Sequence, residues 1–269
     1  MVGRGGQSWI LGQLFKQGWG VVLDALYPPS CLLCGAETHK AGLICSDCFV
    51  RVTPVSAPFC KKCGTPQPSA AYLNSQGACA VCERHPPMWS QARAAFVYDK
   101  AIRELILQLK YADRQENASF LGEHMARAGQ GLIHLESIIT PVPAHKRRLR
   151  QRRYNQAALL AQVIARKSVA HYVPDMLERT RATTRLSGFS RRERYEEMKE
   201  AIQVRPHMLR RVAGRHIVLV DDLLTTGATA SVSAQALLEN GAASVCLLVA
   251  ALVPMQKEID LDSPIAETA

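Results

Sequence analysis

Hydrophobic positions follow two alternating patterns along residues 91–254. Short continuous apolar runs indicate buried strands, whereas apolar residues spaced three and four apart indicate one face of a helix. The expected strands are 92–99, 137–143, 216–222 and 244–253, and the expected helices are 101–111, 117–133, 155–167 and 228–241. Strands that alternate with helices predict an α/β fold, in which right-handed crossovers build a parallel sheet.

Residues 8–26 place apolar side chains at helical spacing, but polar residues such as Gln13 and Lys16 interrupt them. We expect an amphipathic helix that docks on the rest of the protein, with binding to a membrane surface as the alternative. No run reaches the roughly 18 apolar residues of a spanning helix, and the segment lacks the features of a secretory signal. The sequence therefore predicts a cytoplasmic protein with reduced thiols and no membrane span.

Eight of the nine cysteines form four C-x-x-C pairs. Two pairs complete a tetrahedral set of thiolates, so the segment predicts a small double zinc ribbon with two structural zinc ions. We assign the first two pairs to one zinc ion and the last two to the second. The ligands are Cys31, Cys34, Cys45 and Cys48, and then Cys60, Cys63, Cys79 and Cys82. Gly35 and Gly64 directly follow their pairs, where the turn favours a left-handed residue.

Other uses of the paired cysteines stay open. Disulfides or redox-active pairs would use the same spacing, although redox pairs usually occur singly beside a βαβ unit. Iron in a rubredoxin-like site is an alternative to zinc, and interleaved pairs are an alternative to our assignment of ligands. The ninth cysteine, Cys246, falls in an apolar run and is expected in the core.

The stretch "VLVDDLLTTGAT", residues 218–229, carries two acids at the end of an apolar strand and continues in a loop of threonine and glycine. In parallel α/β sheets, ligands bind beyond the carboxyl ends of the strands. Free N–H groups at the start of the next helix suit a phosphate, and the carboxylates of Asp221 and Asp222 suit vicinal hydroxyls. The pattern predicts a sugar-phosphate site, and the alternative is a helix start capped by a threonine.

This stretch resembles the motif with which type I phosphoribosyltransferases bind phosphoribosyl pyrophosphate (PRPP). The resemblance implies that Asp221 and Asp222 serve the reaction by binding the ribose hydroxyls. It implies that the phosphate is bound by Leu224, Thr225, Thr226, Gly227, Ala228 and Thr229. In that family magnesium bridges ribose and pyrophosphate oxygens and neutralises the leaving group, so Mg²⁺ is expected with PRPP.

A narrower resemblance, to the ComF/GntX family of bacterial competence and DNA-utilisation proteins, covers most of the chain. After the cysteine pairs, its motifs are "LKY" at 109–111, "PVP" at 141–143, "RRYNQA" at 152–157, "RTRAT" at 179–183 and "SRRER" at 190–194. The family carries a zinc-ribbon segment on a phosphoribosyltransferase domain. The chain departs from it at Arg153, Leu186 and Glu197, where the family usually has Gly, Gln and Asn. The last two fall in an expected mobile flap over PRPP, so they bear on turnover more than on binding.

Basic residues are in excess, with a net charge of +10 at pH 7 and a pI of about 9.3. The basic residues form two clusters, one directly after "PVP" and a second at residues 179–194. Tyr154, Phe189 and Tyr195 lie among them. This mixture is typical of proteins that bind single-stranded nucleic acid, although a solvated helix face gives the same pattern. The first cluster follows "PVP", is expected to face the pyrophosphate or DNA, and includes Lys146, Arg147, Arg148 and Arg152.

The sequence thus predicts an N-terminal helix, a double zinc ribbon, a phosphoribosyltransferase-like domain and a flexible tail, at 1–27, 28–90, 91–254 and 255–269. Two functions stay open. One is an enzyme that transfers phosphoribosyl from PRPP to an acceptor, and the other is a module that senses PRPP or holds single-stranded DNA. The resemblance implies a role in DNA uptake or use, with competence or DNA-processing proteins as partners. No residue identifies the acceptor or the oligomeric state.

Overall fold

The computed structural model describes residues 28–145, 149–150, 153–180 and 201–254. The chain forms two compact units, unit 1 (residues 1–51) and unit 2 (residues 52–269). The division falls between the second and third cysteine pairs, so the expected zinc-ribbon segment contributes to both units. The expected N-terminal helix, tail and flap lie outside the described residues. Within the described part of the chain, no helix combines the length and apolar character that crossing a membrane requires.

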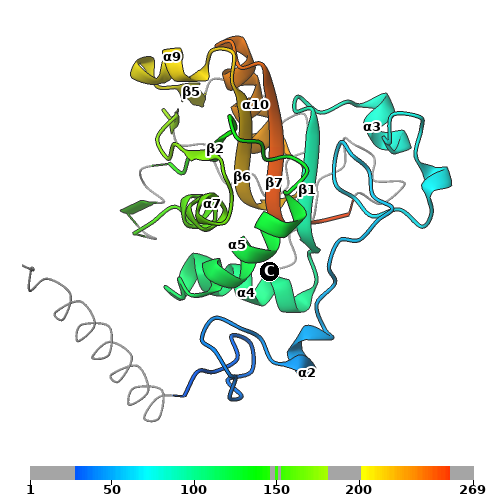
Figure 1. Ribbon diagram of the computed structural model, residues 1–269, viewed down its shortest axis with the longest axis vertical. Coiled ribbons are helices and arrows are strands. Elements are labelled where there is room, and N and C mark those ends of the chain that lie inside the picture. Colours follow the sequence, from blue (N-terminus) through cyan, green and yellow to red (C-terminus); the bar gives the residue numbers. More distant parts are fainter. Residues whose placement is uncertain (1–27, 146–148, 151–152, 181–200, 255–269) are drawn as a thin grey trace, which may run out of the picture. The chain divides into compact units, whose positions relative to one another are not determined.

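Unit 2 is built around a five-stranded parallel sheet in the order β1-β7-β6-β2-β3 (Figure 1). Its strands are β1 (Gln91–Val97), β2 (Ile138–Pro141), β3 (His171–Tyr172), β6 (His216–Leu224) and β7 (Ser244–Leu252). The helices used below are α2 (Ser46–Phe49), α3 (Ala80–Arg84), α4 (Lys100–Tyr111), α5 (Asn117–Ala128), α7 (Gln156–Arg166) and α10 (Ala228–Glu239). The α/β fold with a parallel sheet, predicted from the hydrophobic pattern, is confirmed.

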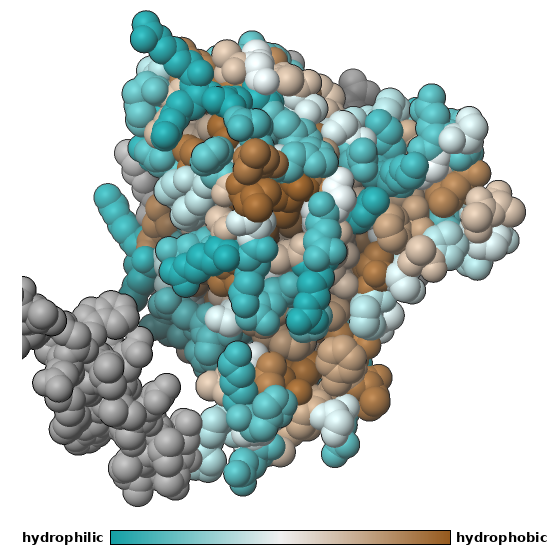
Figure 2. Space-filling model, in the orientation of Figure 1, coloured by the Kyte–Doolittle hydropathy of each residue, from teal (hydrophilic) through white to brown (hydrophobic). Residues whose placement is uncertain are grey.

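Helices cover both faces of this sheet. Ile217 and Leu219 of β6 belong to the same apolar cluster as Leu237 of α10, so this side of the strand faces that helix. Helices α5 and α7 contact each other and the central strands, and they cover the opposite face (Figure 1). Burial on both faces explains why the sequences of β6 and β7 are nearly continuous apolar runs. Outside this core, hydrophilic residues cover much of the face that Figure 2 shows.

Several features differ from the expected elements, and one is the edge strand β3 (His171–Tyr172), which the pattern does not predict. Helix α5 ends at Ala128 rather than at residue 133, because Gly129 interrupts the helical pattern. Strand β6 continues through the two acids to Leu224. A short antiparallel pair, β4 (Leu177–Arg179) and β5 (Ile202–Val204), is not predicted by the pattern. Strands this short contain too few positions to show a period.

The segment before β1 covers the outer edge of that strand. The N–H of Val55 donates to the carbonyl of Ala95 at 3.0 Å, and the N–H of Val97 donates to the carbonyl of Thr53 at 2.8 Å. An open edge strand is a site for unwanted pairing with other chains, and native proteins cover such edges. The chain just before the third cysteine pair is therefore structurally part of the sheet.

Candidate metal centres and phosphate-binding site

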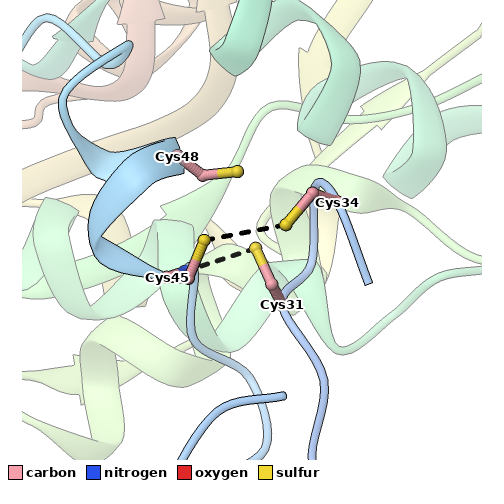
Figure 3. A group of neighbouring side chains, drawn as sticks. All are labelled: Cys31, Cys34, Cys45 and Cys48. Atoms are coloured by element: carbon pink, nitrogen blue, oxygen red, sulfur yellow. Dashed lines mark hydrogen bonds between the residues drawn. The ribbon is translucent and has the colours of Figure 1, made fainter. Parts of the chain in front are cut away.

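The eight paired cysteines gather into two clusters, with the ligand assignment that the order of the pairs predicted. Cluster 1 and cluster 2 consist of Cys31, Cys34, Cys45 and Cys48, and of Cys60, Cys63, Cys79 and Cys82. In each cluster the four sulfur atoms lie within 4.8 Å of one another. The Sγ atoms of Cys34 and Cys45 are 3.6 Å apart (Figure 3), near the edge of about 3.8 Å of a tetrahedron with Zn–S bonds of about 2.3 Å. All nine cysteines are free thiols, so the disulfide and interleaved alternatives are wrong.

Both clusters use the same local turn. The glycine after each first pair has a left-handed φ, which is 75° at Gly35 and 79° at Gly64. The N–H of each glycine donates to the carbonyl of the first cysteine of its pair, Cys31 or Cys60. The left-handed turn predicted for both glycines is therefore confirmed. It brings the two thiols of a pair to one metal position.

The second pair of each cluster begins a short helix. Cys45 is the N-cap of α2, and Cys79 is the N-cap of α3. The N–H of Cys45 donates to Sγ of Cys31 and that of Cys79 donates to Sγ of Cys60, both at 3.3 Å. Hydrogen bonds to sulfur stabilise the thiolate and orient it as a ligand. The two clusters are thus a repeated structure within one chain.

Four neighbouring thiols cannot all ionise without a cation, and the pKa values in cluster 2 show this. Hydrogen bonds from the other three thiols, that of Cys63 foremost, lower the pKa of the Cys60 thiol. Hydrogen bonds with the thiols of Cys60, Cys63 and Cys79, that of Cys60 foremost, raise the pKa of the Cys82 thiol. A divalent cation replaces the protons of such a set, and thiolates are ligands that zinc favours. Both clusters fit structural zinc, because four thiolates complete its coordination.

A small cavity lies at the carboxyl end of β6. Asp221, residues 223–230 and two residues of β7 line a cavity of about 80 Å³. Helix α10 begins directly after Gly227, which has a left-handed φ of 76°, and no side chain caps this helix start. The alternative of a turn capped by a threonine is therefore wrong. The first N–H groups of a helix have no partner within the helix, so an uncapped start suits an anion.

The two acids of β6 have different partners, because successive side chains of a strand point to opposite faces. Asp221 lines the cavity, and its Oδ1 accepts a hydrogen bond from the N–H of Asp222 at 2.9 Å. Asp222 is only 8% exposed, and its Oδ2 lies 3.0 Å from Nζ of Lys110 in α4. The pairing of β2 with β6 ends at Pro141 and Val220, directly before the two acids.

Family motifs that are distant in sequence meet around these acids. The hydroxyl of Tyr154 donates to the carbonyl of Leu109 at 2.8 Å, next to Lys110. The side-chain amide of Asn155 donates to the carbonyl of Val142 at 2.9 Å. Sequence reasoning gives Lys110 no role, because one lysine in an amphipathic helix carries no signal in its spacing. Its place in the "LKY" motif is the one indication that the sequence offers.

The basic residues that the sequence predicts as ligands of pyrophosphate or DNA fall outside the described part of the chain. Lys146, Arg147, Arg148 and Arg152 lie outside the described residues, as does most of the second basic cluster. Arg153 is described, and its φ of 63° is left-handed. The left-handed conformation is costly for a residue with a side chain, which explains why the family usually has glycine at this position.

Comparisons with known proteins agree with this arrangement. The double zinc ribbon domain matches residues 22–83, and the phosphoribosyl transferase domain matches residues 157–265. The DNA utilization protein YhgH of Escherichia coli (strain K12) is 36% identical over 208 residues, which cover 75% of this chain and 87% of that protein. YhgH of Salmonella typhimurium is 34% identical over 227 residues, covering 81% and 94%. Competence protein ComFC of Bacillus subtilis is 26% identical over 209 residues, covering 75% and 80%. The chain therefore belongs to the ComF/GntX family, whose members join a double zinc ribbon to a phosphoribosyltransferase domain.

Proposed function

We propose that unit 2 binds PRPP, with its 5′-phosphate at Leu224–Thr229 and a ribose hydroxyl at Asp221. The observation that carries this proposal is the uncapped start of α10 beside a cavity lined by a carboxylate. The N–H groups and the positive end of the helix dipole favour the phosphate. The carboxylate accepts a hydrogen bond from the hydroxyl, and the loop threonines supply further hydroxyl donors.

Asp222 supplies the second carboxylate of the site, and Lys110 holds it. The pair is mostly buried, with side-chain exposures of 19% for Lys110 and 12% for Asp222. Removing one partner of a buried ion pair leaves an uncompensated charge and destabilises the protein. Lys110 therefore holds the carboxylate of Asp222 in place near the carboxyl end of β6.

Phosphoribosyl transfer would break the bond between C1 of the ribose and a pyrophosphate oxygen and form a bond from C1 to the acceptor. Mg²⁺, which arrives with PRPP, supplies positive charge for the leaving pyrophosphate. The described residues hold the sugar phosphate, so their contribution is positioning. The alternative is a module that binds PRPP without turnover. Release of pyrophosphate on addition of a candidate acceptor distinguishes the enzyme from the binding module.

Calorimetry with PRPP and Mg²⁺ tests the site. Asp221→Asn keeps the shape of the side chain and removes its charge. A hydrogen bond to a charged group contributes about 1.5–3 kcal/mol, so the affinity for PRPP should fall by at least about 10-fold. The absence of PRPP binding by the wild type contradicts the proposed function. Unchanged affinity of Asp221→Asn contradicts the role of that carboxylate.

The pair of Lys110 and Asp222 is tested by a double-mutant cycle, because Asp222→Asn alone also breaks the ion pair with Lys110. Asp222→Asn should lower both stability and PRPP affinity. Adding Lys110→Met should restore much of the stability and none of the affinity, since the charge imbalance is removed while the carboxylate stays absent. Recovery of affinity in the double variant would show that Asp222 acts only in folding.

A role in DNA uptake or use is the wider context that we propose, in the cytoplasm and with competence or DNA-processing proteins as partners. It is supported by relatives that are named for DNA utilization and competence, and by the net charge of +10.

The second candidate function is binding of single-stranded DNA by the basic clusters. Four to six engaged cations predict a slope of log affinity against log salt of about −3 to −4. Arg147→Ala combined with Arg148→Ala should flatten that slope by about one unit. A slope near zero would leave PRPP as the ligand of these residues.

A further inference from the structure

Trp89 connects cluster 2 with the phosphate loop. It lies in the segment between α3 and β1, and it is only 4% exposed. Its indole N–H donates to the carbonyl of Lys62 at 2.7 Å. Lys62 is one of the two residues between Cys60 and Cys63, so this carbonyl belongs to the turn that holds two of the metal ligands.

The six-membered ring of Trp89 lies against the backbone of the loop at Gly227. A Cβ atom added to Gly227 would lie 2.8 Å from Cη2 and 3.6 Å from Cζ3 of the indole. It would also lie 3.4 Å from Cδ1 of Leu224. Gly227 is the last residue before α10, so the indole contacts the loop directly before the first N–H groups of that helix. An indole is flat and rigid, and here its N–H is bonded to the metal turn while its ring touches the loop.

Cluster 2 is itself fixed to the sheet. The N–H of Ala92 donates to the carbonyl of Lys61 at 2.9 Å, which joins β1 to the metal turn. A Cβ atom on Gly64 would lie 3.3 Å from Cδ2 of Leu252 and 3.5 Å from the backbone nitrogen of Ala94. The turn, Trp89 and the loop are all parts of unit 2. They form a continuous line of contacts from the metal ligands to the phosphate loop.

We propose that Trp89 is a positioning residue for the phosphate loop, and that zinc bound by cluster 2 is a functional part of the PRPP site. The inference rests on the PRPP binding proposed above. Zinc fixes the turn at Lys62, the turn fixes the indole, and the indole sets the position of Gly227 and of the N–H groups that follow. A displacement of about 1 Å in a binding site costs up to about 100-fold in function. Loss of the ring or of the metal should therefore weaken phosphate binding while the acids stay intact.

Ribose 5-phosphate is the sharpest probe, because it carries the phosphate for the loop and no pyrophosphate. Trp89→Leu should weaken calorimetric binding of PRPP–Mg²⁺ and of ribose 5-phosphate by the same factor, at least about 10-fold. It should leave the affinity for inorganic pyrophosphate and the zinc content unchanged. Trp89→Phe keeps a ring without the N–H donor and should give an intermediate loss. Equal affinity of Trp89→Leu and the wild type for ribose 5-phosphate overturns the inference.

A matched control separates positioning from general destabilisation. Phe120 is also 4% exposed, and its ring stacks on Phe96 with centroids 5.9 Å apart. Phe120→Leu should lower the unfolding temperature and keep the wild-type affinity for ribose 5-phosphate. If Phe120→Leu weakens binding as much as Trp89→Leu does, Trp89 has no specific role in the loop.

Fluorescence gives a readout that a purely structural role would not move. The chain has three tryptophans, and replacing Trp9 and Trp19 by phenylalanine leaves Trp89 as the one emitter. Ribose 5-phosphate should change its emission, with a midpoint equal to the calorimetric dissociation constant. If calorimetry shows that ribose 5-phosphate binds but the emission of Trp89 does not change, the ring does not contact a loop that responds to the ligand.

The role of the metal is tested by removing one ligand from each cluster, so that each variant is the control for the other. Cys60→Ser should lose one zinc ion and the affinity for ribose 5-phosphate, whereas Cys31→Ser should lose one zinc ion and keep that affinity. If Cys60→Ser does not fold, the Trp89 variants still decide, since they retain all eight thiols. A wild type that binds neither PRPP nor ribose 5-phosphate refutes the proposed function. A wild type that binds both, with Trp89→Leu binding equally well, refutes this inference alone.

Discussion

The two cysteine clusters have the same ligands and the same turns in different surroundings. In cluster 2 all four cysteines are buried, whereas in cluster 1 Cys34 is exposed and Cys45 is partly buried. The turn glycines differ in the same way. A Cβ atom on Gly35 would meet no atom within 4 Å, while one on Gly64 would touch Leu252 and the backbone of β1.

The role of each metal turn depends on what its backbone packs against. Cluster 1 staples a short segment that has few large apolar side chains of its own. The turn of cluster 2 is bonded to β1 through the carbonyl of Lys61 and, through Trp89, contacts the phosphate loop. One double zinc ribbon domain matches residues 22–83, yet the compact units divide at Arg51. The two sets of four cysteines are equivalent in sequence, but they belong to different compact units and have different structural roles.

The largest test of this comparison removes one ligand from each cluster. The wild type should carry two zinc ions per chain, and Cys31→Ser and Cys60→Ser should each carry one. Binding of structural zinc is worth about 10–16 kcal/mol in small zinc domains, as much as the whole stability of a typical domain, about 5–15 kcal/mol. Hydrogen exchange should show lost protection within residues 28–51 for Cys31→Ser, and along β1 for Cys60→Ser. The same pattern of exchange in both variants would contradict the distinction between the clusters.

The two turn glycines give a finer test. Gly35→Ala should cost about 1–2 kcal/mol, the penalty of a left-handed residue that has a side chain. Gly64→Ala carries the same penalty and also places its methyl group 3.3 Å from Cδ2 of Leu252, where overpacking adds about 1 kcal/mol or more. Chemical denaturation followed by circular dichroism measures the difference. Equal costs would mean that the side chain of Leu252 moves aside for the new methyl group.

Much of this fold could be predicted from the sequence, because its strongest signals are local. The apolar runs of β6 and β7 gave buried parallel strands, and the spacing of the cysteines gave the ligand sets. Gly35 and Gly64 were predictable as left-handed, since a tight turn holds the first pair of each cluster. The strands β4 and β5 were not predictable, since each has three residues and a long segment separates them.

The site was less predictable, because its contacts join residues that are distant in sequence. The acids and the loop form one contiguous motif, so the cavity at Asp221 could be located. Nothing in the sequence shows that Asp222 would pair with Lys110, which is more than one hundred residues away. Trp89 gave no signal either, since a lone tryptophan before a strand is usually a core residue. Its role depends on two contacts that exist only in the folded protein.

The sulfur atoms of the two clusters have different hydrogen-bond partners, which should affect metal affinity. In cluster 1, Nη2 of the exposed Arg51 donates to Sγ of Cys48 at 2.7 Å. In cluster 2, the hydroxyl of the buried Thr65 lies 3.1 Å from Sγ of Cys63. Arg51→Met and Thr65→Val should each lower zinc affinity by about 10-fold, as loss of a partner around a metal ligand typically does.

Salt distinguishes these two partners. Exposed charges are screened by salt, and buried neutral hydrogen bonds are not. In competition with a chromophoric chelator, the effect of Arg51→Met should shrink at high salt, and that of Thr65→Val should persist. A salt-independent effect of Arg51→Met would mean that the arginine is as protected from solvent as Thr65, which would remove one difference between the clusters.

Arg153 extends the comparison of left-handed turns and should show the smallest effect. Its φ of 63° matches the region that Gly35 and Gly64 occupy, but here the chain has a side chain. Arg153→Gly should stabilise unit 2 by about 0.5–1 kcal/mol, since the left-handed penalty of about 1–2 kcal/mol exceeds the extra chain entropy of glycine. Arg153→Ala is the matched control and should give no gain, because the Cβ atom that causes the strain remains. Thermal unfolding measures both variants. A lower unfolding temperature for Arg153→Gly would mean that the guanidinium makes a contact worth more than the strain, and PRPP affinity measured on the same variant would then show whether that contact belongs to the site.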